Sequence, residues 1–263
     1  MNTYPINVNG NGFRLDDGTI VSSGGPLGHS YVVWRSMQHG GSLARWGMWL
    51  EEFPELRKQL IFEHMISVAD LMDQKAGLMN SVGCSLDRSL IQRAARLHDF
   101  SEPLRRRDVP ATKKTAADDL AEYLVFKRVN EGLGAPLWPE RQEAFLLQTC
   151  IDNDPVFPRD ARDIMRSLYS EHRWEAIFFK AMEWYDYLHS AFEGTYESEV
   201  EEMLPTVSAR HVPMLDSVVE KWPEFGRAVW TPEVRRFFAE AASHYHVTTF
   251  GPTRRQLELF AEP

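Results

Sequence analysis

The sequence predicts an all-α protein. From about residue 43 onward, apolar residues recur three and four positions apart, which is the spacing of one face of a helix. Prolines fall between these periodic segments rather than inside them, at positions 103, 110, 136, 139, 155 and 158. The apolar runs are a few residues long and flanked by charge, far short of the roughly 20 residues that cross a bilayer. We therefore expect a helical protein without a membrane span.

The periodic segments give the helices in order. We expect helices near residues 43–50, 60–73, 86–98, 116–130, 141–150, 159–169 and 174–192, and two more near 213–219 and 232–244. Ser85 and Thr115 precede two of these segments and are predicted to cap them, because a hydroxyl can accept a bond from the first free N–H groups. Pro155 follows Asp154 and should end the fifth segment.

The two ends of the chain differ from its middle. Residues 8–12 and 15–20 combine glycine, asparagine and aspartate between short extended runs, which favours an irregular or β-hairpin N-terminal arm over residues 1–40. An acidic stretch at 197–202 followed by Pro205 marks a boundary. We expect a helical core over residues 41–195 and a C-terminal helical extension over 196–263 that packs on it.

Composition limits the class of protein. The chain has 263 residues, of which 43% are hydrophobic, enough for one substantial core. Its formal net charge of -9 argues against a broad grip on a nucleic-acid polymer, because phosphate neutralisation needs surplus Lys and Arg. Cys84 and Cys150 lack metal or redox spacing, and the N-terminus lacks the pattern of a secretory signal. We expect a cytoplasmic protein with reduced cysteines.

A set of histidines and carboxylates predicts a metal site. His98 and Asp99 are adjacent at the end of a predicted helix, where both side chains can turn toward one cation. His64 opens an earlier helix, and Glu183 and Asp186 are three residues apart on a later one, so they share a face. Such a mixed nitrogen and oxygen site suits Mn, Co, Fe, Ni or Zn, with Mg as a further possibility, and leaves positions for water and substrate.

These residues resemble the HD-domain phosphohydrolase superfamily, whose pattern is His, then His-Asp, then a distal Asp. The run from His98 to Glu102, followed by residues 108–110, is similar to the HD-x-S-E … D-x-P signature of its 5′-deoxynucleotidase branch. Two further stretches resemble that branch. One is Arg45-Trp46, ahead of the first His, and the other is residues 175–183, in which a Lys stands three residues before the position of the family's last metal ligand. The resemblance covers about residues 43–193.

The resemblance implies an HD-domain helical bundle that holds one divalent metal ion. It implies that His64, His98 and Asp99 are ligands, and that a distal carboxylate completes the set. The family's distal Asp is replaced by Glu183; we favour Glu183 as this ligand, with Asp186 one turn later as the alternative. The family also implies a possible homodimer.

The remaining site residues follow from the same resemblance. Glu102 would position or deprotonate the attacking water, and Asp108 would contact the sugar or assist the leaving group. Arg45 would clamp the phosphate with two parallel bonds, and Trp46 would shape the sugar or base pocket. The interval to Asp108 is one residue longer than in the family, and it contains the run Arg105-Arg106-Arg107.

The resemblance predicts hydrolysis of a nucleotide, foremost a deoxynucleoside 5′-monophosphate to nucleoside and phosphate. Two alternatives stay open at this point. The basic run at 105–107 would suit a dNTP triphosphohydrolase, and the change to Glu183 would suit a non-catalytic module that binds nucleotides or partners. A di-iron oxygenase of the same superfamily is disfavoured, because it needs further histidines that the interval from Glu102 to Glu171 lacks.

Overall fold

The computed structural model describes residues 12–14, 20–22, 45–54, 56–105, 114–132, 138–151 and 155–244. The helices of these ranges, in chain order, are α2 (Gly47–Glu52), α3 (Ile61–Ser81), α4 (Arg88–Ala95), α5 (Ser101–Arg105), α6 (Ala116–Gly132), α7 (Trp138–Leu146), the 3-10 turn η1 (Leu147–Thr149), α8 (Arg159–Glu171), α9 (Arg173–Glu197), α10 (Met203–Lys221), α11 (Pro223–Ala228) and α12 (Pro232–Ser243). The all-α prediction is confirmed for the body of the described chain.

Two short strands lie within the predicted N-terminal arm. β1 (Gly12–Arg14) and β2 (Ile20–Ser22) pair antiparallel, with Phe13 opposite Val21. The rest of the arm predicted for residues 1–40 lies outside the described residues.

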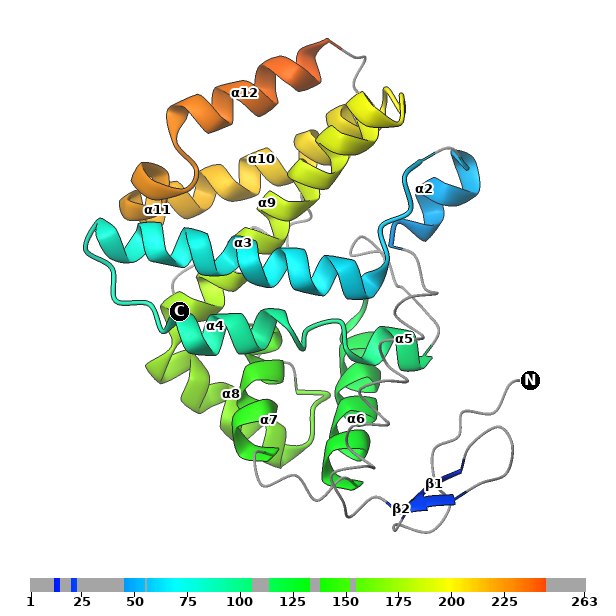
Figure 1. Ribbon diagram of the computed structural model, residues 1–263. Helices are drawn as coiled ribbons and strands as arrows, with labels where there is room; N and C mark the ends of the chain where they lie inside the picture. The colour runs from blue at the N-terminus through cyan, green and yellow to red at the C-terminus, as the bar shows by residue number, and fades with distance from the viewer. Residues whose placement is uncertain are drawn as a thin grey trace.

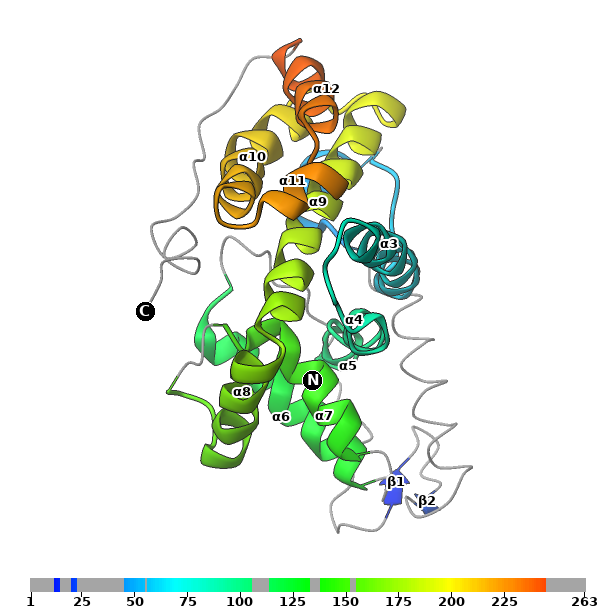
Figure 2. The same ribbon diagram turned by 90° about the vertical axis from the view of Figure 1, so that its left-hand side faces the viewer.

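Helix α9 is the axis of the helical body. It is the longest described helix, and α3, α4, α8, η1, α10 and α12 all contact it. Figures 1 and 2 show α10, α11 and α12 gathered at one end of α9, and α6, α7 and α8 at the other, with α3 crossing its middle. The helix continues past residue 195, where the core was predicted to end, and α10 then folds back along it.

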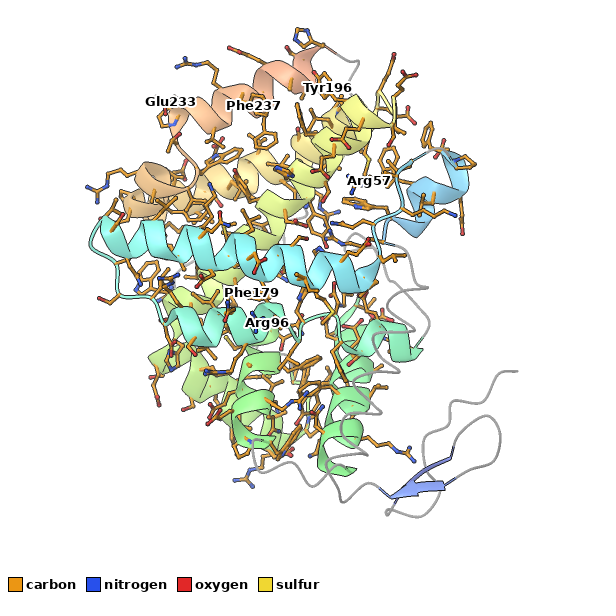
Figure 3. All side chains as sticks on the ribbon, in the orientation of Figure 1. Arg57, Arg96, Phe179, Tyr196, Glu233 and Phe237 are labelled. Atoms are coloured by element: carbon orange, nitrogen blue, oxygen red, sulfur yellow. The ribbon has the colours of Figure 1, made fainter. Side chains whose placement is uncertain are left out.

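The core forms where α9 meets α3 and α4. Phe178 and Phe179 of α9, Met72 of α3 and Ile91 of α4 are completely buried; Figure 3 labels Phe179 in this interior. Burying a side chain of this size contributes roughly 1.5–3 kcal/mol, which fixes the three helices against one another. Among the described helices, none is both long and apolar enough to cross a membrane.

The cap predictions have opposite outcomes. Thr115 caps α6 as predicted: its hydroxyl accepts from the Asp118 N–H at 3.3 Å, and the Asp118 carboxylate accepts from the Thr115 N–H at 3.1 Å. The prediction that Ser85 caps the preceding end of the next helix is wrong. Helix α4 begins at Arg88, and its cap is Asp87, whose carboxylate accepts from the Leu90 N–H at 2.9 Å. Asp87 also donates its N–H to Glu175 of α9 at 2.9 Å, so the tertiary contact sets where α4 starts.

The C-terminal helices differ from the predicted ranges. Helix α10 begins at Met203, ten residues before the predicted start at Pro213, which lies inside the helix. Pro205 occupies the first turn, where the missing N–H has no partner within the helix to lose. Because α10 packs along α9 with Leu204, Val207 and Leu215 buried, this contact outweighs the lost bond at Pro213. The short helices α5 and α11 were not predicted.

Candidate metal centre

Three donor atoms from two places in the chain converge on one point. His64 is the fourth residue of α3, and His98 and Asp99 lie in the turn that joins α4 to α5. The Nε2 atoms of the two imidazoles are 3.1 Å apart. The Oδ2 atom of Asp99 lies 3.0 Å from Nε2 of His98 and 3.3 Å from Nε2 of His64. His64, His98 and Asp99 meet as predicted, whereas neither Glu183 nor Asp186 of α9 is among the convergent donors of the described residues.

These separations fit a transition-metal ion. Ligand atoms lie about 2.1 Å from such an ion, so neighbouring ligands are about 3.0 Å apart in an octahedron and about 3.4 Å apart in a tetrahedron. The three distances among His64, His98 and Asp99 fall in or next to this interval. The group can therefore hold a metal through three adjacent positions of its coordination shell.

The contact between His98 and the backbone of α4 fixes which ring nitrogen faces the shared point. Its Nδ1 lies 2.7 Å from the carbonyl oxygen of Ala95, which can only accept, so Nδ1 carries the proton. In the neutral ring, Nε2 then presents a lone pair. Gln148 donates to the backbone carbonyl of His98 at 3.1 Å, and the ring of Phe179 packs edge-on against the imidazole. A histidine bound to a metal characteristically has this arrangement.

Burial and charge act differently on the three groups. Burial lowers the pKa of His64, and the nearby Arg45 guanidinium lowers it further. Burial also opposes the charged form of His98, but the Asp99 carboxylate and then Glu183 raise the pKa of that imidazole above its ordinary value. Despite burial, the imidazoles of His98 and His64 hold the pKa of Asp99 well below its usual range. Asp99 is thus a carboxylate, which is the form that binds a cation.

Arg45 and Asp186 form a buried ion pair behind His64. The Nη1 atom of Arg45 lies 2.8 Å from Oδ2 of Asp186, and both side chains are less than a tenth exposed. The same oxygen lies 3.5 Å from Nδ1 of His64, the ring nitrogen that faces away from the shared point. Asp186 therefore lies beside the imidazole without a hydrogen bond to Nδ1, and within the described residues it is not one of the three convergent donors.

Aromatic rings hold the Arg45 guanidinium in place. It lies 5.4 Å from the ring centre of Trp46 and 5.0 Å from that of Tyr187, and these two rings meet edge to face. Both of its hydrogen bonds to side chains, to Asp186 and to Gln59, use Nη1. Trp46 has a left-handed backbone, with φ of 64°, which is strained for a bulky residue. Strain of this kind persists where surrounding contacts determine the conformation.

The other predicted site residues are placed as follows. Glu183 is paired with Lys180 at 2.8 Å and does not belong to the convergent donors of the described residues. Glu102 is buried in α5, directly after the His98–Asp99 turn. Asp108 lies outside the described residues, as do Arg106 and Arg107.

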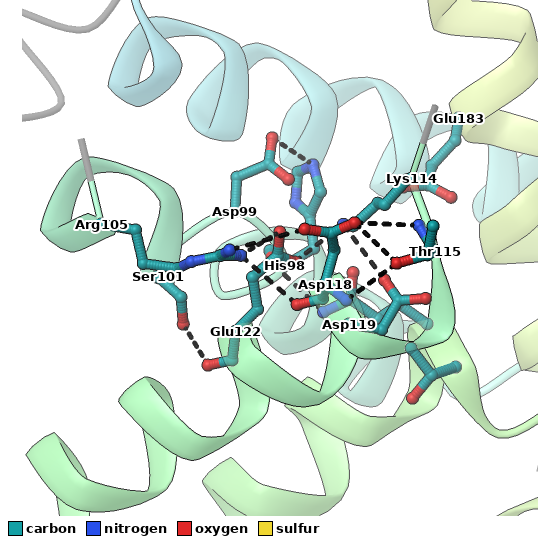
Figure 4. Close-up of polar contacts among 12 residues, drawn as sticks. His98, Asp99, Ser101, Arg105, Lys114, Thr115, Asp118, Asp119, Glu122 and Glu183 are labelled. Carbon is teal, nitrogen blue, oxygen red and sulfur yellow. Dashed lines mark hydrogen bonds and ion pairs between the residues drawn. The ribbon is translucent and has the colours of Figure 1, made fainter. Parts of the chain in front are cut away.

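An ion-pair network adjoins the turn on its α6 side. Arg105 bonds Glu122 at 3.1 Å, and Lys114 lies 2.7 Å from the other oxygen of that carboxylate (Figure 4). Burial opposes the charge of Lys114, but Glu122, Asp119 and Glu102 raise its pKa well above the ordinary value. Arg105, a candidate for contacting phosphate, is therefore bound to carboxylates of α6.

A pocket of about 370 Å³ lies between the start of α3 and the second half of α9. Trp46 forms part of its wall, together with Gln59, Glu63, Ser190 and Met203. Gln59 also bonds Arg45, so one residue connects the pocket wall to the ion pair.

Several residues of the site were not predicted. Gln148, Lys114 and Tyr187 hold or surround the predicted groups through contacts between elements far apart in the chain. No local pattern marks Gln148 or Lys114. Tyr187 follows Asp186 directly, but only the packing of α9 against residue 45 brings its ring to the guanidinium.

Comparison of the chain with protein families, with curated proteins and with solved structures found no match.

Proposed function

We propose that this chain is a metal-dependent phosphohydrolase of the HD type that acts on a nucleotide, foremost a deoxynucleoside 5′-monophosphate. The observation that carries the proposal is the convergence of His64, His98 and Asp99 within one coordination shell. Two imidazoles with one carboxylate favour a first-row transition ion over Mg. The order His, His-Asp along the chain is the order found in that superfamily.

A divalent cation bound by these residues would supply Lewis acidity toward a phosphoryl group and the attacking water. The chain's own groups would do the rest. Among the described residues, Nη2 and Nε of Arg45 have no hydrogen-bond partner, so this edge of the guanidinium is available. Two parallel N–H groups match two oxygens of a phosphate, and the buried position strengthens the attraction. Arg45 would thus bind the phosphate while Asp186 holds it in orientation.

Glu102 would accept the proton of the attacking water. Its side chain is buried on α5, and its backbone N–H bonds the carbonyl of Asp99 at 3.1 Å, which ties the start of the helix to the turn that carries His98 and Asp99. A carboxylate with a fixed position beside the reacting water is suited to general-base work. The role of Asp108 at the sugar or leaving group is part of the same proposal.

The pocket beside Trp46 would take the nucleoside. Its volume of about 370 Å³ is at the lower end of sites for small molecules. An indole ring in its wall can stack on a base or pack on a sugar. Phosphate and nucleoside would then bind to two consecutive residues of the chain, Arg45 and Trp46.

The test is turnover by the purified full chain, stripped with a chelator and reloaded with Mn²⁺ or Co²⁺. We expect phosphate release from at least one deoxynucleoside 5′-monophosphate in a panel of mono-, di- and triphosphates. Asp99→Asn should abolish it, because the cation loses its one anionic ligand among the three. Arg45→Lys should raise KM, since one ammonium cannot reproduce two parallel bonds.

The control is Asp73→Asn, a surface carboxylate that pairs with Arg88 and should leave turnover unchanged. Product analysis separates the classes of enzyme: nucleoside and phosphate from a monophosphatase, tripolyphosphate and nucleoside from a triphosphohydrolase. A protein that binds the metal and is inert toward the whole panel would contradict the proposed function.

A further inference from the structure

Arg210 is a buried cation that has no counter-ion among the described residues. It lies on α10 and is only 6% exposed. Its Nε is completely buried and has no hydrogen-bond partner, and no carboxylate of the described residues pairs with the guanidinium. Arg45 is equally buried but has Asp186 at 2.8 Å. The two arginines therefore differ in charge compensation, not in burial.

An uncompensated guanidinium inside a protein is unfavourable. Burial lowers the pKa of Arg210, yet a guanidinium stays charged at neutral pH, so the group cannot escape by losing its proton. A buried charge needs a partner of opposite sign, supplied by the protein or by a ligand. The described residues supply none, and a bound anion would supply the missing charge.

The groups around Arg210 also suit an anion. Tyr187 of α9 lies near the guanidiniums of both Arg210 and Arg45, and its ring lies 5.0 Å from that of Arg45. Burial raises the pKa of Tyr187 to about 12, so its hydroxyl keeps a proton to donate. His211 packs on the same ring at 5.1 Å, and burial lowers its pKa to about 3, so this imidazole is neutral. The surroundings thus offer donors and positive charge.

We propose that Arg210 is an oxyanion-binding residue that α10 contributes beside Tyr187, and that its ligand is a phosphate group. Helices α9 and α10 pack along each other (Figure 1), and His211, the residue after Arg210, packs its ring on Tyr187 of α9. The phosphate has two sources, a substrate or a free anion. The substrate source rests on the proposed function; the assignment of Arg210 does not, because it needs neither metal nor turnover.

The first experiment measures inorganic phosphate binding to the metal-free full chain by calorimetry and by thermal unfolding. We expect wild type to bind phosphate and to gain Tm with it. Arg210→Met should weaken the Kd at least about tenfold, since it removes a charge-assisted contact. In phosphate-free buffer the same variant should unfold at or above the wild-type Tm, because it removes an uncompensated charge. Arg210→Gln, which keeps a polar side chain, serves as a second variant.

The control is Arg227→Met, an exposed arginine paired with Glu224, which should bind phosphate as wild type does. Absence of phosphate binding to wild type, or equal binding by both Arg210 variants, would overturn the assignment whatever the enzyme's activity.

A second measurement, phosphate binding with and without Mn²⁺, identifies the source of the phosphate at Arg210. Both of its outcomes below are consistent with Arg210 as an oxyanion-binding residue. If loading with Mn²⁺ tightens phosphate binding in wild type and this gain is lost in Asp99→Asn, the phosphate at Arg210 belongs to the substrate position. If the Kd is the same in both proteins with and without Mn²⁺, Arg210 binds a free anion at a separate site.

Discussion

The buried pair of Arg45 and Asp186 predicts a large loss of stability when one partner is neutralised. Asp186→Asn keeps the shape of the side chain but leaves the Arg45 guanidinium, 7% exposed, without its carboxylate. Breaking one side of a buried pair costs about 3–5 kcal/mol. For a chain of this size each kcal/mol lowers Tm by about 2–4 °C, so the expected fall is roughly 6–20 °C.

The measurement is urea unfolding of the metal-free protein, followed by far-ultraviolet circular dichroism. The matched control is Asp160→Asn, whose carboxylate lies 2.6 Å from the Lys127 ammonium but is 54% exposed. A surface pair of this kind is worth at most about 1 kcal/mol. Arg45→Met combined with Asp186→Leu should recover most of the loss, because no charge is then left unpaired.

The reasoning would be refuted if Asp186→Asn lost no more stability than Asp160→Asn. Metal affinity gives a second readout from the same variant. Since Asp186 faces Nδ1 of His64, the ring nitrogen opposite to the shared point, its loss should weaken metal binding about 10–100-fold rather than abolish it. Complete loss of binding would instead identify Asp186 as a ligand.

Three further predictions concern the metal, pH and packing. Free Mn²⁺ at 100 times its Kd should stabilise wild type by about 2.7 kcal/mol and should not stabilise Asp99→Asn. Thermal unfolding measures both gains, and equal gains would exclude a metal site at His64, His98 and Asp99. The folded state keeps His211 neutral, with a pKa near 3, whereas the unfolded imidazole titrates near 6.5. The contribution of His211 to stability is therefore complete above about pH 6.5 and declines toward pH 3 by up to about 1.4 kcal/mol per pH unit. His211→Gln should flatten the pH dependence of the unfolding free energy, as urea unfolding measures. An unchanged pH dependence would refute the neutral, buried state of His211. A Cβ on Gly194 would come within 2.5 Å of Met203 Sδ, whereas one on Gly77 meets nothing closer than 3.7 Å. By chemical denaturation, Gly194→Ala should lose about 1–2 kcal/mol and Gly77→Ala gain about 0.4–1 kcal/mol; the same sign for both would contradict this packing.

The amino-acid order alone determined the helical class and the main groups of the candidate site. Helical periodicity is a local property, so the long amphipathic segments from α3 to α9 could be located without knowing what they pack against. Because His98 and Asp99 are adjacent at a helix end, both side chains must lie near the same turn, and this holds without knowledge of the neighbouring helices. Where tertiary contacts compete with local signals, the sequence misled: Asp87, bound to Glu175, replaced Ser85 as a cap, and α10 ran through Pro213.

Only the tertiary structure decided how the carboxylates and arginines near His98 and Asp99 are paired. Glu183 and Asp186 are three residues apart and share a face of α9, so their spacing could not rank them. The packing of α9 against α3 and residue 45 turns Asp186 toward Arg45, 141 positions away in the chain, and leaves Glu183 paired with Lys180. Helix packing gives Arg45 a carboxylate partner and gives Arg210 none among the residues that the structure describes. Burial and pairing are properties of contacts between distant segments, and no local pattern encodes them.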